Sequence, residues 1–193
     1  MIRSVSVIAI GILSGCAVSP PKNTENACQL LAEKPGWYDA VNDASGSWNV
    51  SEGLILSFIR QESSFVSNAK PPRTKILGII PGPRASSAYG YPQAKDGTWG
   101  DYRQATNSYL AVRDNFRDAA DFVGWYVDQT YRKMKVSKTN YFKQYLYYYN
   151  GWTKQLRPES ISYAKTVART AKKYKKQIMR CQSKLNKKKY IVF

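Results

Sequence analysis

The sequence predicts a single, mainly α-helical domain. Apolar residues recur at three- and four-residue intervals in several long stretches, which is the pattern of amphipathic helices that bury one face. Strand patterns are scarce. The roughly 165 residues after the N-terminal segment suit one domain, and nothing between Gln29 and Met179 has the composition and length of a dividing linker.

The first predicted helices lie in the N-terminal third. Ala27–Glu33 is predicted as a short helix that a Pro-Gly pair ends. The polar stretch 42–47, which lies between aromatic residues, is interpreted as a loop. The next helix is predicted over 51–65, with Asn49 or Ser51 as its N-cap.

A segment rich in proline and glycine, 68–87, follows this helix. Its apolar island, Ile76–Ile80, is either a strand of a small hairpin or an apolar lid, because so few residues show no decisive period. Residues 90–99 then form a loop that leads into a helix.

Three further helices complete the predicted domain. The first runs from Asn115 to Met134, the second is capped by Thr139, and the third begins at Pro158-Glu159. Their predicted inward-facing residues are Phe116, Ala120, Val123, Val127, Tyr131 and Met134 in the first, Tyr141, Phe142, Tyr145, Leu146 and Tyr149 in the second, and Ile161, Ala164, Ala168, Ala171 and Ile178 in the third.

One acidic residue lies on the apolar side of the 51–65 helix. Leu54, Ile55, Phe58 and Ile59 share one face, and the next position on that face is Glu62. Burial and the negative helix C-terminus both disfavour the ionised carboxylate, so they raise its pKa. A glutamate that stays protonated near neutral pH can act as a general acid on a glycosidic oxygen.

A structural role for this glutamate is the alternative. At a helix end the Glu62 side chain can turn into water, or it can pair with Arg60 or a downstream lysine. Periodicity by itself leaves both readings open.

The N-terminus has the features of an export signal. Met1 and Arg3 precede an apolar run, 5–13, that is too short to cross a bilayer. The run ends in Leu-Ser-Gly-Cys, which resembles the bacterial lipobox and implies lipidation at Cys16; an ordinary secretory peptide with a chance cysteine is the alternative. Ala17 after the cysteine, by resemblance to Gram-negative sorting rules, favours the outer membrane.

These features predict four segments. They are a signal peptide (1–15), a lipidated N-terminus and tether (16–26), a catalytic domain (27–181) and a basic C-terminal tail (182–193). The predicted location is the periplasmic face of a bacterial membrane.

The cysteine and histidine content limits the chemistry. Apart from Cys16, the two cysteines Cys28 and Cys181 lie near the two ends of the predicted domain. In an oxidising compartment an even pair favours a disulfide, with two free thiols as the alternative. The chain has no histidine, which excludes Ser/His and Cys/His nucleophile systems and most zinc sites. We expect no metal and no cofactor.

The charge is strongly positive and unevenly distributed. The net charge is +17, and residues 131–193 contain eighteen Lys and Arg against one acid, Glu159. Such a surface attracts polyanions, and export argues against nucleic acid. The lysines at 172–173, 175–176 and 187–189 either dock on a membrane or secretion apparatus or form a solvated helix face and tail.

Four short motifs occur in order along the chain. Ile59–Phe65 is an apolar helix end that contains Arg-Gln-Glu-Ser, and Gly90–Thr98 begins with Gly-Tyr-Pro-Gln. Tyr148–Gly151 reads Tyr-Tyr-Asn-Gly, and Glu159–Tyr163 reads Glu-Ser-Ile-Ser-Tyr. Each motif is weak alone, whereas four in this order form a specific pattern.

The four motifs resemble those of SLT-type lytic transglycosylase domains, which belong to the lysozyme-like superfamily. The family motifs are Arg-Gln-Glu-Ser-x-Phe, Gly-Leu-Met-Gln, Ala-Tyr-Asn-x-Gly and Glu-Thr-x-x-Tyr. The resemblance spans roughly residues 37–175. It implies a goose-type or SLT-type lysozyme-like fold, with a small β-hairpin or irregular insertion around 71–84.

Three departures from the family pattern stand out. Pro92 occupies the methionine position of the second motif, and Trp152 stands where the third motif has its glycine. The segment 71–84 lengthens the chain between the first two motifs beyond the usual family spacing.

The resemblance also implies a reaction with one catalytic carboxylate. Glu62 would protonate the glycosidic oxygen between N-acetylmuramic acid (MurNAc) and N-acetylglucosamine (GlcNAc), and would then accept the proton of the MurNAc C6 hydroxyl. The product is a 1,6-anhydro sugar. The nearest later acids, Asp96 and Asp101, are interpreted as turn and loop residues rather than as a second catalytic group.

The remaining implied site residues bind substrate. Tyr149 would hydrogen-bond or orient Glu62, and the groove would be lined by a further set, Ser64, Gln93, Asn150 and Tyr163. A core or capping role is the alternative for the tyrosines, Gln93 and Asn150.

The predicted partners are the glycan strands of peptidoglycan and, through the lipid, a membrane; the protein is expected to be a monomer. Two other functions remain open at this point. One is a muramidase that hydrolyses the same bond, and the other is a non-catalytic peptidoglycan-binding lipoprotein.

Overall fold

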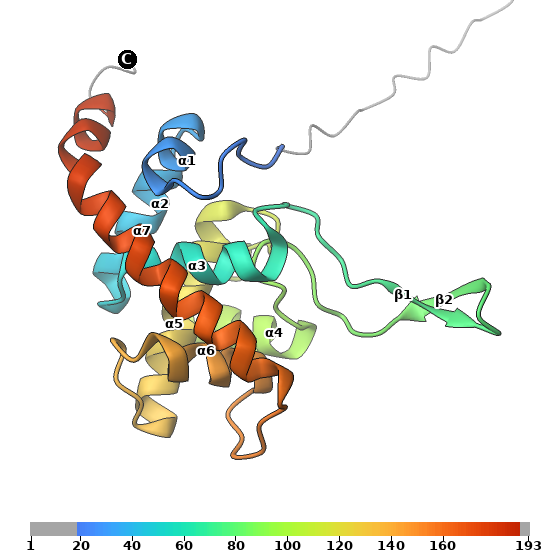
Figure 1. The fold of residues 1–193 in the computed structure, drawn as a ribbon. Coiled ribbons are helices and arrows are strands. Elements are labelled where there is room, and N and C mark those ends of the chain that lie inside the picture. Colours follow the sequence, from blue (N-terminus) through green and yellow to red (C-terminus); the bar gives the residue numbers. More distant parts are fainter. Residues whose placement is uncertain (1–18, 190–193) are drawn as a thin grey trace, which may run out of the picture.

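The computed structural model describes residues 19–189, which are mainly helical, as predicted (Figure 1). One two-stranded antiparallel sheet accompanies the helices of this part. The elements are α1 (Ala27–Glu33), α2 (Trp37–Trp48), α3 (Glu52–Ser63), β1 (Arg73–Ile76), β2 (Ile80–Arg84), α4 (Asp96–Thr106), α5 (Phe116–Met134), α6 (Tyr141–Asn150) and α7 (Glu159–Lys189).

Helix α3 lies at the centre of the fold. Every residue from Gly53 to Ile59 is buried, although only one face of the helix is strongly apolar. The long helix α7 crosses α3 at close range (Figure 1). A Cβ atom at Gly53 would lie 2.5 Å from the carbonyl oxygen of Ala171, so only glycine permits this approach.

Helix α1 closes one end of α7. The Asn26 side chain caps α1 by accepting hydrogen bonds from two backbone N–H groups. The disulfide between Cys28 and Cys181 joins the two helices, with the Cα atoms 6.1 Å apart, and confirms the predicted pair. It closes a loop of 153 residues, which in the chain-entropy model stabilises the fold by about 5 kcal/mol.

The predicted loop at 42–47 was wrong, because these residues belong to α2. The helix buries Trp37, Val41 and Ala44, which are spaced by four and three residues, while its polar residues face solvent. Trp37 stacks on Phe116 of α5, with ring centroids 3.7 Å apart. Tertiary packing therefore outweighs a polar local composition that contains a glycine and four Asn, Asp or Ser residues of low helix propensity.

The segment 71–84 forms a hairpin. Strands β1 and β2 pair antiparallel, with Ile76 opposite Ile80 and Lys75 opposite Pro81. The hairpin projects away from the helical body (Figure 1). Of the two alternatives for the apolar island, the structure supports the hairpin.

Of the N-caps predicted for two helices, one agrees with the structure and one does not. The backbone places Ser51 at the N-cap position of α3, and Asn49 instead ends α2. The predicted cap Thr139 was wrong, because the side chain of Asn140 accepts the backbone N–H of Lys143 at 3.1 Å. A residue directly before the first turn is the one whose side chain reaches that N–H.

The inward faces of α5 and α7 also differ in part from the prediction. Tyr131 and Ile161 are exposed, at 50% and 42% of their surface. The buried stripe of α7 instead consists of Ser160, Ala164, Val167, Ala171, Tyr174, Ile178, Cys181 and Leu185. This stripe starts one residue earlier than predicted. Ser160 is polar but can be buried, because its hydroxyl donates a hydrogen bond to the carbonyl of Arg157.

Helix α7 continues through Lys189, so the predicted C-terminal tail begins inside this helix. Leu185 still packs on the core there. The predicted signal peptide, Cys16 and Ala17 lie outside the described residues. Within the described part, no helix has the length and apolarity needed to span a membrane.

Candidate active site

A cleft of about 690 Å³ opens where the end of α3 meets α5, α6 and the segment before α4. Aromatic rings from α5 and α6 form much of its lining, and polar side chains come from the connecting segments. The lining residues are Gln61, Glu62, Pro71, Pro72, Ser86, Ala88, Gln93, Ala94, Lys95, Thr98, Phe122, Tyr126, Tyr145, Tyr148, Tyr149, Asn150, Gly151, Arg157 and Tyr163.

Glu62 lies in the last turn of α3 and reaches this cleft. The four residues of the predicted stripe are fully buried, so the helix presents Glu62 at the end of an apolar face, as expected. Oε1 of Glu62 accepts a hydrogen bond of 2.7 Å from the Tyr145 hydroxyl. Arg60 points elsewhere and forms an ion pair with Glu25. The predicted alternative of a Glu62–Arg60 pair was therefore wrong.

The surroundings of Glu62 favour its protonated form. The side chain keeps partial contact with solvent in the cleft, but protein atoms enclose the carboxyl on its other sides. This desolvation raises the pKa of Glu62 from 4.5 to about 7, and the hydrogen bond from Tyr145 opposes the rise in part. The carboxyl can therefore release and regain a proton near neutral pH.

Glu62 is the one carboxylate among the described residues that line the cleft. Asp96 pairs with Arg113 at 2.8 Å, and Asp101 is exposed on α4; neither lines the cleft. No group of three or more acidic, cysteine or histidine side chains suited to a metal occurs among the described residues. The other charged residues in the lining are cations, Lys95 and Arg157.

Comparison with known families decides the identity of this helical domain. A family model described as transglycosylase SLT domain matches residues 4–181. The chain belongs to the transglycosylase SLT domain family. A search of curated proteins found no match. Membership supports a lytic-transglycosylase-type function that acts on peptidoglycan.

The first and third SLT motifs line the same cleft, but the tyrosine that hydrogen-bonds to Glu62 lies on α6 before the third motif. We predicted Tyr149 as the hydrogen-bonding partner, and this was wrong: the donor is Tyr145, one helical turn earlier. Tyr149 lines the cleft nearby, with its ring centroid 6.4 Å from that of Tyr145. The inward-facing position of Tyr145 was the available signal, but it indicated only a core residue.

The second SLT motif forms a tight loop beside Glu62. Gly90 has φ 75°, and a Cβ there would lie 2.2 Å from the Arg113 carbonyl oxygen, so the position requires glycine. Gln93 has φ 49°, and its amide donates to the carbonyls of Ala69 and Gly90 at 2.9 and 2.8 Å. Gln93 therefore lines the cleft while it also holds this loop closed.

The SLT departures at Pro92 and Trp152 have clear structural consequences. The carbonyl of Pro92 accepts a 2.6 Å hydrogen bond from the Tyr148 hydroxyl, which ties the second motif to α6. Trp152 stacks on Tyr126 and donates its indole N–H to Thr130. Trp152 does not line the cleft, whereas the preceding Gly151, at φ 77°, does.

The other predicted binding residues divide into two groups. Asn150 lines the cleft at the end of α6, where its amide donates to the Leu146 carbonyl and its oxygen accepts the Arg157 N–H. Tyr163 lines the cleft from α7, 5.6 Å from the ring of Tyr149. Ser64 ends α3 at φ 50° and lies outside the cleft, in a separate small groove. The structure therefore does not bring Ser64 to the other site residues.

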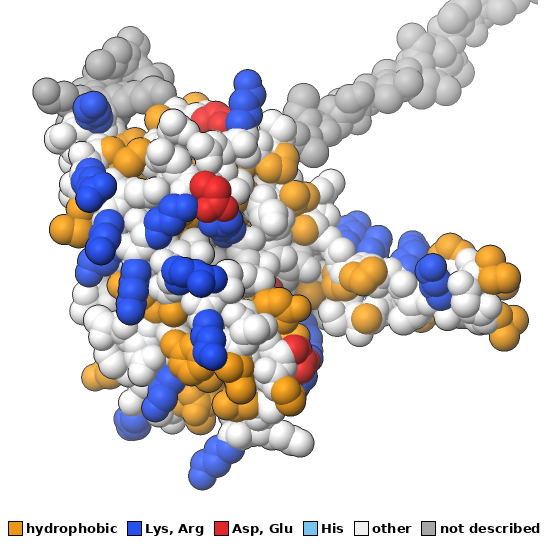
Figure 2. Space-filling view, viewed as in Figure 1, with side chains coloured by type: hydrophobic (Ala, Val, Ile, Leu, Met, Phe, Trp, Pro, Cys, Tyr) orange, Lys and Arg blue, Asp and Glu red, His pale blue; other side chains and the backbone are white. Residues whose placement is uncertain are grey.

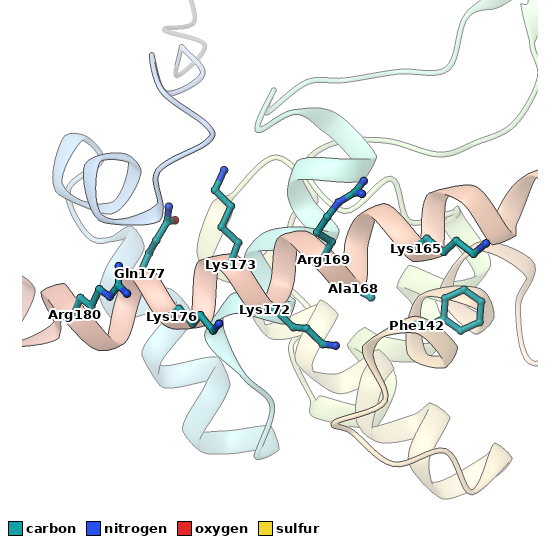
Figure 3. Close-up of a pocket in the computed structure, with 9 residues that line it drawn as sticks. All are labelled: Phe142, Lys165, Ala168, Arg169, Lys172, Lys173, Lys176, Gln177 and Arg180. Atoms are coloured by element: carbon teal, nitrogen blue, oxygen red, sulfur yellow. The ribbon is translucent and has the colours of Figure 1, made fainter.

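A second groove, of about 670 Å³, runs along α7 (Figure 3). Phe142 and Ala168 form its apolar part, and its other side chains are mostly cations, namely Lys165, Arg169, Lys172, Lys173, Lys176 and Arg180. Figure 2 shows positive side chains spread over the face of the molecule that α7 crosses. With no carboxylate in its lining, this groove offers no general acid. Its role as a docking surface stays a prediction.

Because the raised pKa of Glu62 is a property of the fold, it predicts a pH-dependent stability. Between pH 4.5 and 7 the unfolded glutamate loses its proton while the folded one keeps it, so stability falls as pH rises and stays low above pH 7. The variant Glu62→Gln lacks this effect. From pH 4 to pH 8 we expect its stability to increase relative to wild type by about 3 kcal/mol, measured by urea unfolding.

The matched control for this measurement is Glu52→Gln at the other end of α3. A carboxylate there lies in the first turn, where the helix dipole favours its charge, so its removal gives no such gain at pH 8. An equal stability difference between Glu62→Gln and wild type at both pH values would contradict the raised pKa.

Proposed function

We propose that this protein is a lytic transglycosylase that cleaves the β-1,4 bond between MurNAc and GlcNAc with Glu62 as acid and then base. The observation that carries the proposal is a single carboxylate, with a pKa of about 7, in a cleft lined by aromatic and polar side chains. The family match supports the substrate class.

In the first step, protonated Glu62 gives its proton to the glycosidic oxygen. The C1–O bond of MurNAc breaks, GlcNAc leaves as the free alcohol, and positive charge develops at C1. Glu62 is then a carboxylate. Its negative charge and the tyrosine-rich wall of the cleft face this developing charge.

In the second step, the C6 hydroxyl of the same MurNAc attacks C1. Glu62 accepts the hydroxyl proton, the 1,6-anhydro ring closes, and the carboxyl is protonated for another cycle. No water is consumed. A pKa of about 7 suits both steps, because the group must give and take a proton at the same pH.

Tyr145 is proposed to position Glu62 throughout this cycle. Its hydroxyl donates to Oε1, and burial holds the ring in place; burial and the neighbouring carboxylate together raise the pKa of Tyr145, so that it remains a hydrogen-bond donor. Lys95 and Arg157, on the cleft lining, suit the carboxylates of the peptides attached to MurNAc.

The two rival functions are less well supported by the site. A hydrolytic muramidase usually uses a second carboxylate as base or nucleophile, and the described lining contains none. A non-catalytic binding protein gains nothing from a buried carboxyl of raised pKa, because that burial opposes folding above pH 4.5.

We further propose that the protein acts at the periplasmic face of the outer membrane, attached through Cys16. The support is the apolar run, the Leu-Ser-Gly-Cys sequence and the following Ala17. Cells given labelled palmitate should label the wild-type protein, and Cys16→Ser should abolish the label. Equal labelling of both would refute the anchor.

The activity prediction concerns Glu62 itself. Purified Glu62→Gln should lose at least about a thousandfold in the rate of sacculus cleavage, since the amide cannot transfer the proton in either step. Wild type should release muropeptides that end in 1,6-anhydroMurNAc, detected by mass spectrometry. Reducing ends alone would identify a muramidase, and inactive wild type that still binds sacculi would identify the binding protein.

The second activity prediction concerns the hydrogen bond from Tyr145. In Tyr145→Phe the carboxylate loses its donor, so the pKa of Glu62 rises further and the alkaline limb of kcat/KM moves to higher pH. We also expect kcat to fall about tenfold as the carboxyl loses its fixed orientation. Tyr149→Phe is the matched control, and its alkaline limb should stay where wild type has it. An unmoved limb in Tyr145→Phe would argue for a packing role alone.

A further inference from the structure

The hairpin of β1 and β2 ends in an exposed apolar tip. Leu77 and Ile79 are 86% and 85% exposed, and Ile80 is 56% exposed. Leu77 and Ile79 lie in the turn between the strands, and Ile80 begins β2. The hairpin projects from the body (Figure 1), and hydrophobic side chains gather at its far end (Figure 2). A soluble surface normally gains nothing from large apolar side chains clustered in this way.

The turn itself gives no structural reason for the leucine. Leu77 has φ 53° and the following Gly78 has φ 76°. Glycine and asparagine tolerate this left-handed region, whereas leucine is strained there, and Asn-Gly is a preferred pair where two successive residues have positive φ. A strained and largely exposed leucine indicates that the side chain serves an interaction outside the domain.

The stem of the hairpin is cationic. Arg73, Lys75 and Arg84 lie in the strands, and Lys70 precedes them, over the ring of Tyr89. The sequence contains no acidic residue between Glu62 and Asp96. None of these four cations forms an ion pair with another described residue. The arginines donate instead to backbone carbonyls at the hairpin, Arg73 to Gly82 and Arg84 to Pro71. Figure 2 shows positive side chains along the stem and hydrophobic ones at the end.

We propose that this hairpin docks on an anionic phospholipid bilayer. The tip residues Leu77, Ile79 and Ile80 enter the interfacial region, and the stem cations lie at the level of the phosphate headgroups. Apolar side chains flanked by lysine and arginine are the combination that binds a protein reversibly to the surface of an anionic membrane.

Other occupants of the hairpin fit less well. A second strand, from another protein or another copy, finds no N–H at two positions of β2, Pro81 and Pro83. The other edge, β1, is only four residues long and carries Arg73 and Lys75, and short charged edges disfavour strand addition. The basic groove on α7 has charge but few apolar side chains, so it lacks the part of the surface that enters a bilayer. Among the described residues the hairpin combines both properties on one projecting element.

The docked hairpin would also orient the cleft. Pro71 and Pro72, at the base of the hairpin, line the cleft that contains Glu62. Strands of four and five residues extend about 15 Å. The cleft would therefore open at about this distance from the membrane surface. This inference goes beyond the proposed reaction, and it holds or fails whether or not Glu62 is catalytic.

A local fluorescent probe tests the proposal. The full chain with Cys16→Ser keeps its disulfide and has no free thiol, so Ile79→Cys can be labelled with an environment-sensitive dye. We expect vesicles of phosphatidylethanolamine with phosphatidylglycerol to raise the emission roughly twofold and shift it to the blue, because the probe enters the interface. Neutral phosphatidylcholine vesicles should leave the emission unchanged.

The matched control carries the same dye at another exposed leucine. Leu110, between α4 and α5, is 93% exposed but lies on the body rather than on the hairpin. The label on Leu110→Cys should not respond to either vesicle. An equal response at both positions, or none at position 79, would overturn the proposal. A response that needs no vesicles and grows with protein concentration would assign the tip to a second copy of the chain.

Two substitutions separate membrane binding from folding. Leu77→Asn relieves the strained turn, so the hairpin stays formed, yet it should lower vesicle binding of the position-79 probe roughly tenfold. Lys75→Gln should lower it about fivefold, since one basic residue near an anionic surface contributes about 1 kcal/mol. Unchanged resistance of residues 71–84 to proteolysis would show that the hairpin is intact. Undiminished binding in both variants would overturn the proposal.

Discussion

The site depends on the hydrogen bond between Tyr145 and Glu62, and this bond depends on how α3 is held. Helix α3 is buried from Gly53 to Ile59, and α7 approaches it so closely at Gly53 that a side chain would collide with the backbone of Ala171. Helix α6 also packs on α7, so α7 fixes the end of α3 relative to α6. The 2.7 Å contact follows from the packing of three helices rather than from the local sequence of either partner.

Two opposing effects set the chemistry of this carboxyl, and their balance gives it both roles. Burial alone would keep Glu62 protonated and leave it a poor base, whereas strong hydrogen bonding would make it a permanent carboxylate and a poor acid. Burial outweighs the one hydrogen bond from Tyr145, which leaves the pKa of Glu62 at about 7. Because of this raised pKa, the ionised form of Glu62 lowers the free energy of unfolding by about 3 kcal/mol at high pH. An otherwise well-packed core of buried helices can tolerate this loss.

Much of the fold and the central residue of the site could be predicted from the sequence, because apolar periodicity records which face of a helix is buried. That period placed Glu62 at the end of α3, and the even pair of cysteines in an exported chain predicted the disulfide. The loop predicted at 42–47 failed because local composition hid a buried face that only α5 completes. Tyr145 was assigned to the core, because no pattern within one helix tells a packed tyrosine from one that donates to a residue 83 positions away.

The N-terminal segment and the hairpin together bear on how the cleft meets its substrate. Lys173 pairs with Glu25 at 2.7 Å and Tyr174 donates to the carbonyl of Thr24, so the chain enters the domain at a fixed place on α7. A lipid at Cys16 would lie only three residues before the first described residue. A single attachment at the N-terminus leaves a protein free to rotate above a bilayer. A second contact, at the tip of the hairpin, would remove this freedom, strengthen membrane binding, and hold the Glu62 cleft at one distance and orientation above the bilayer.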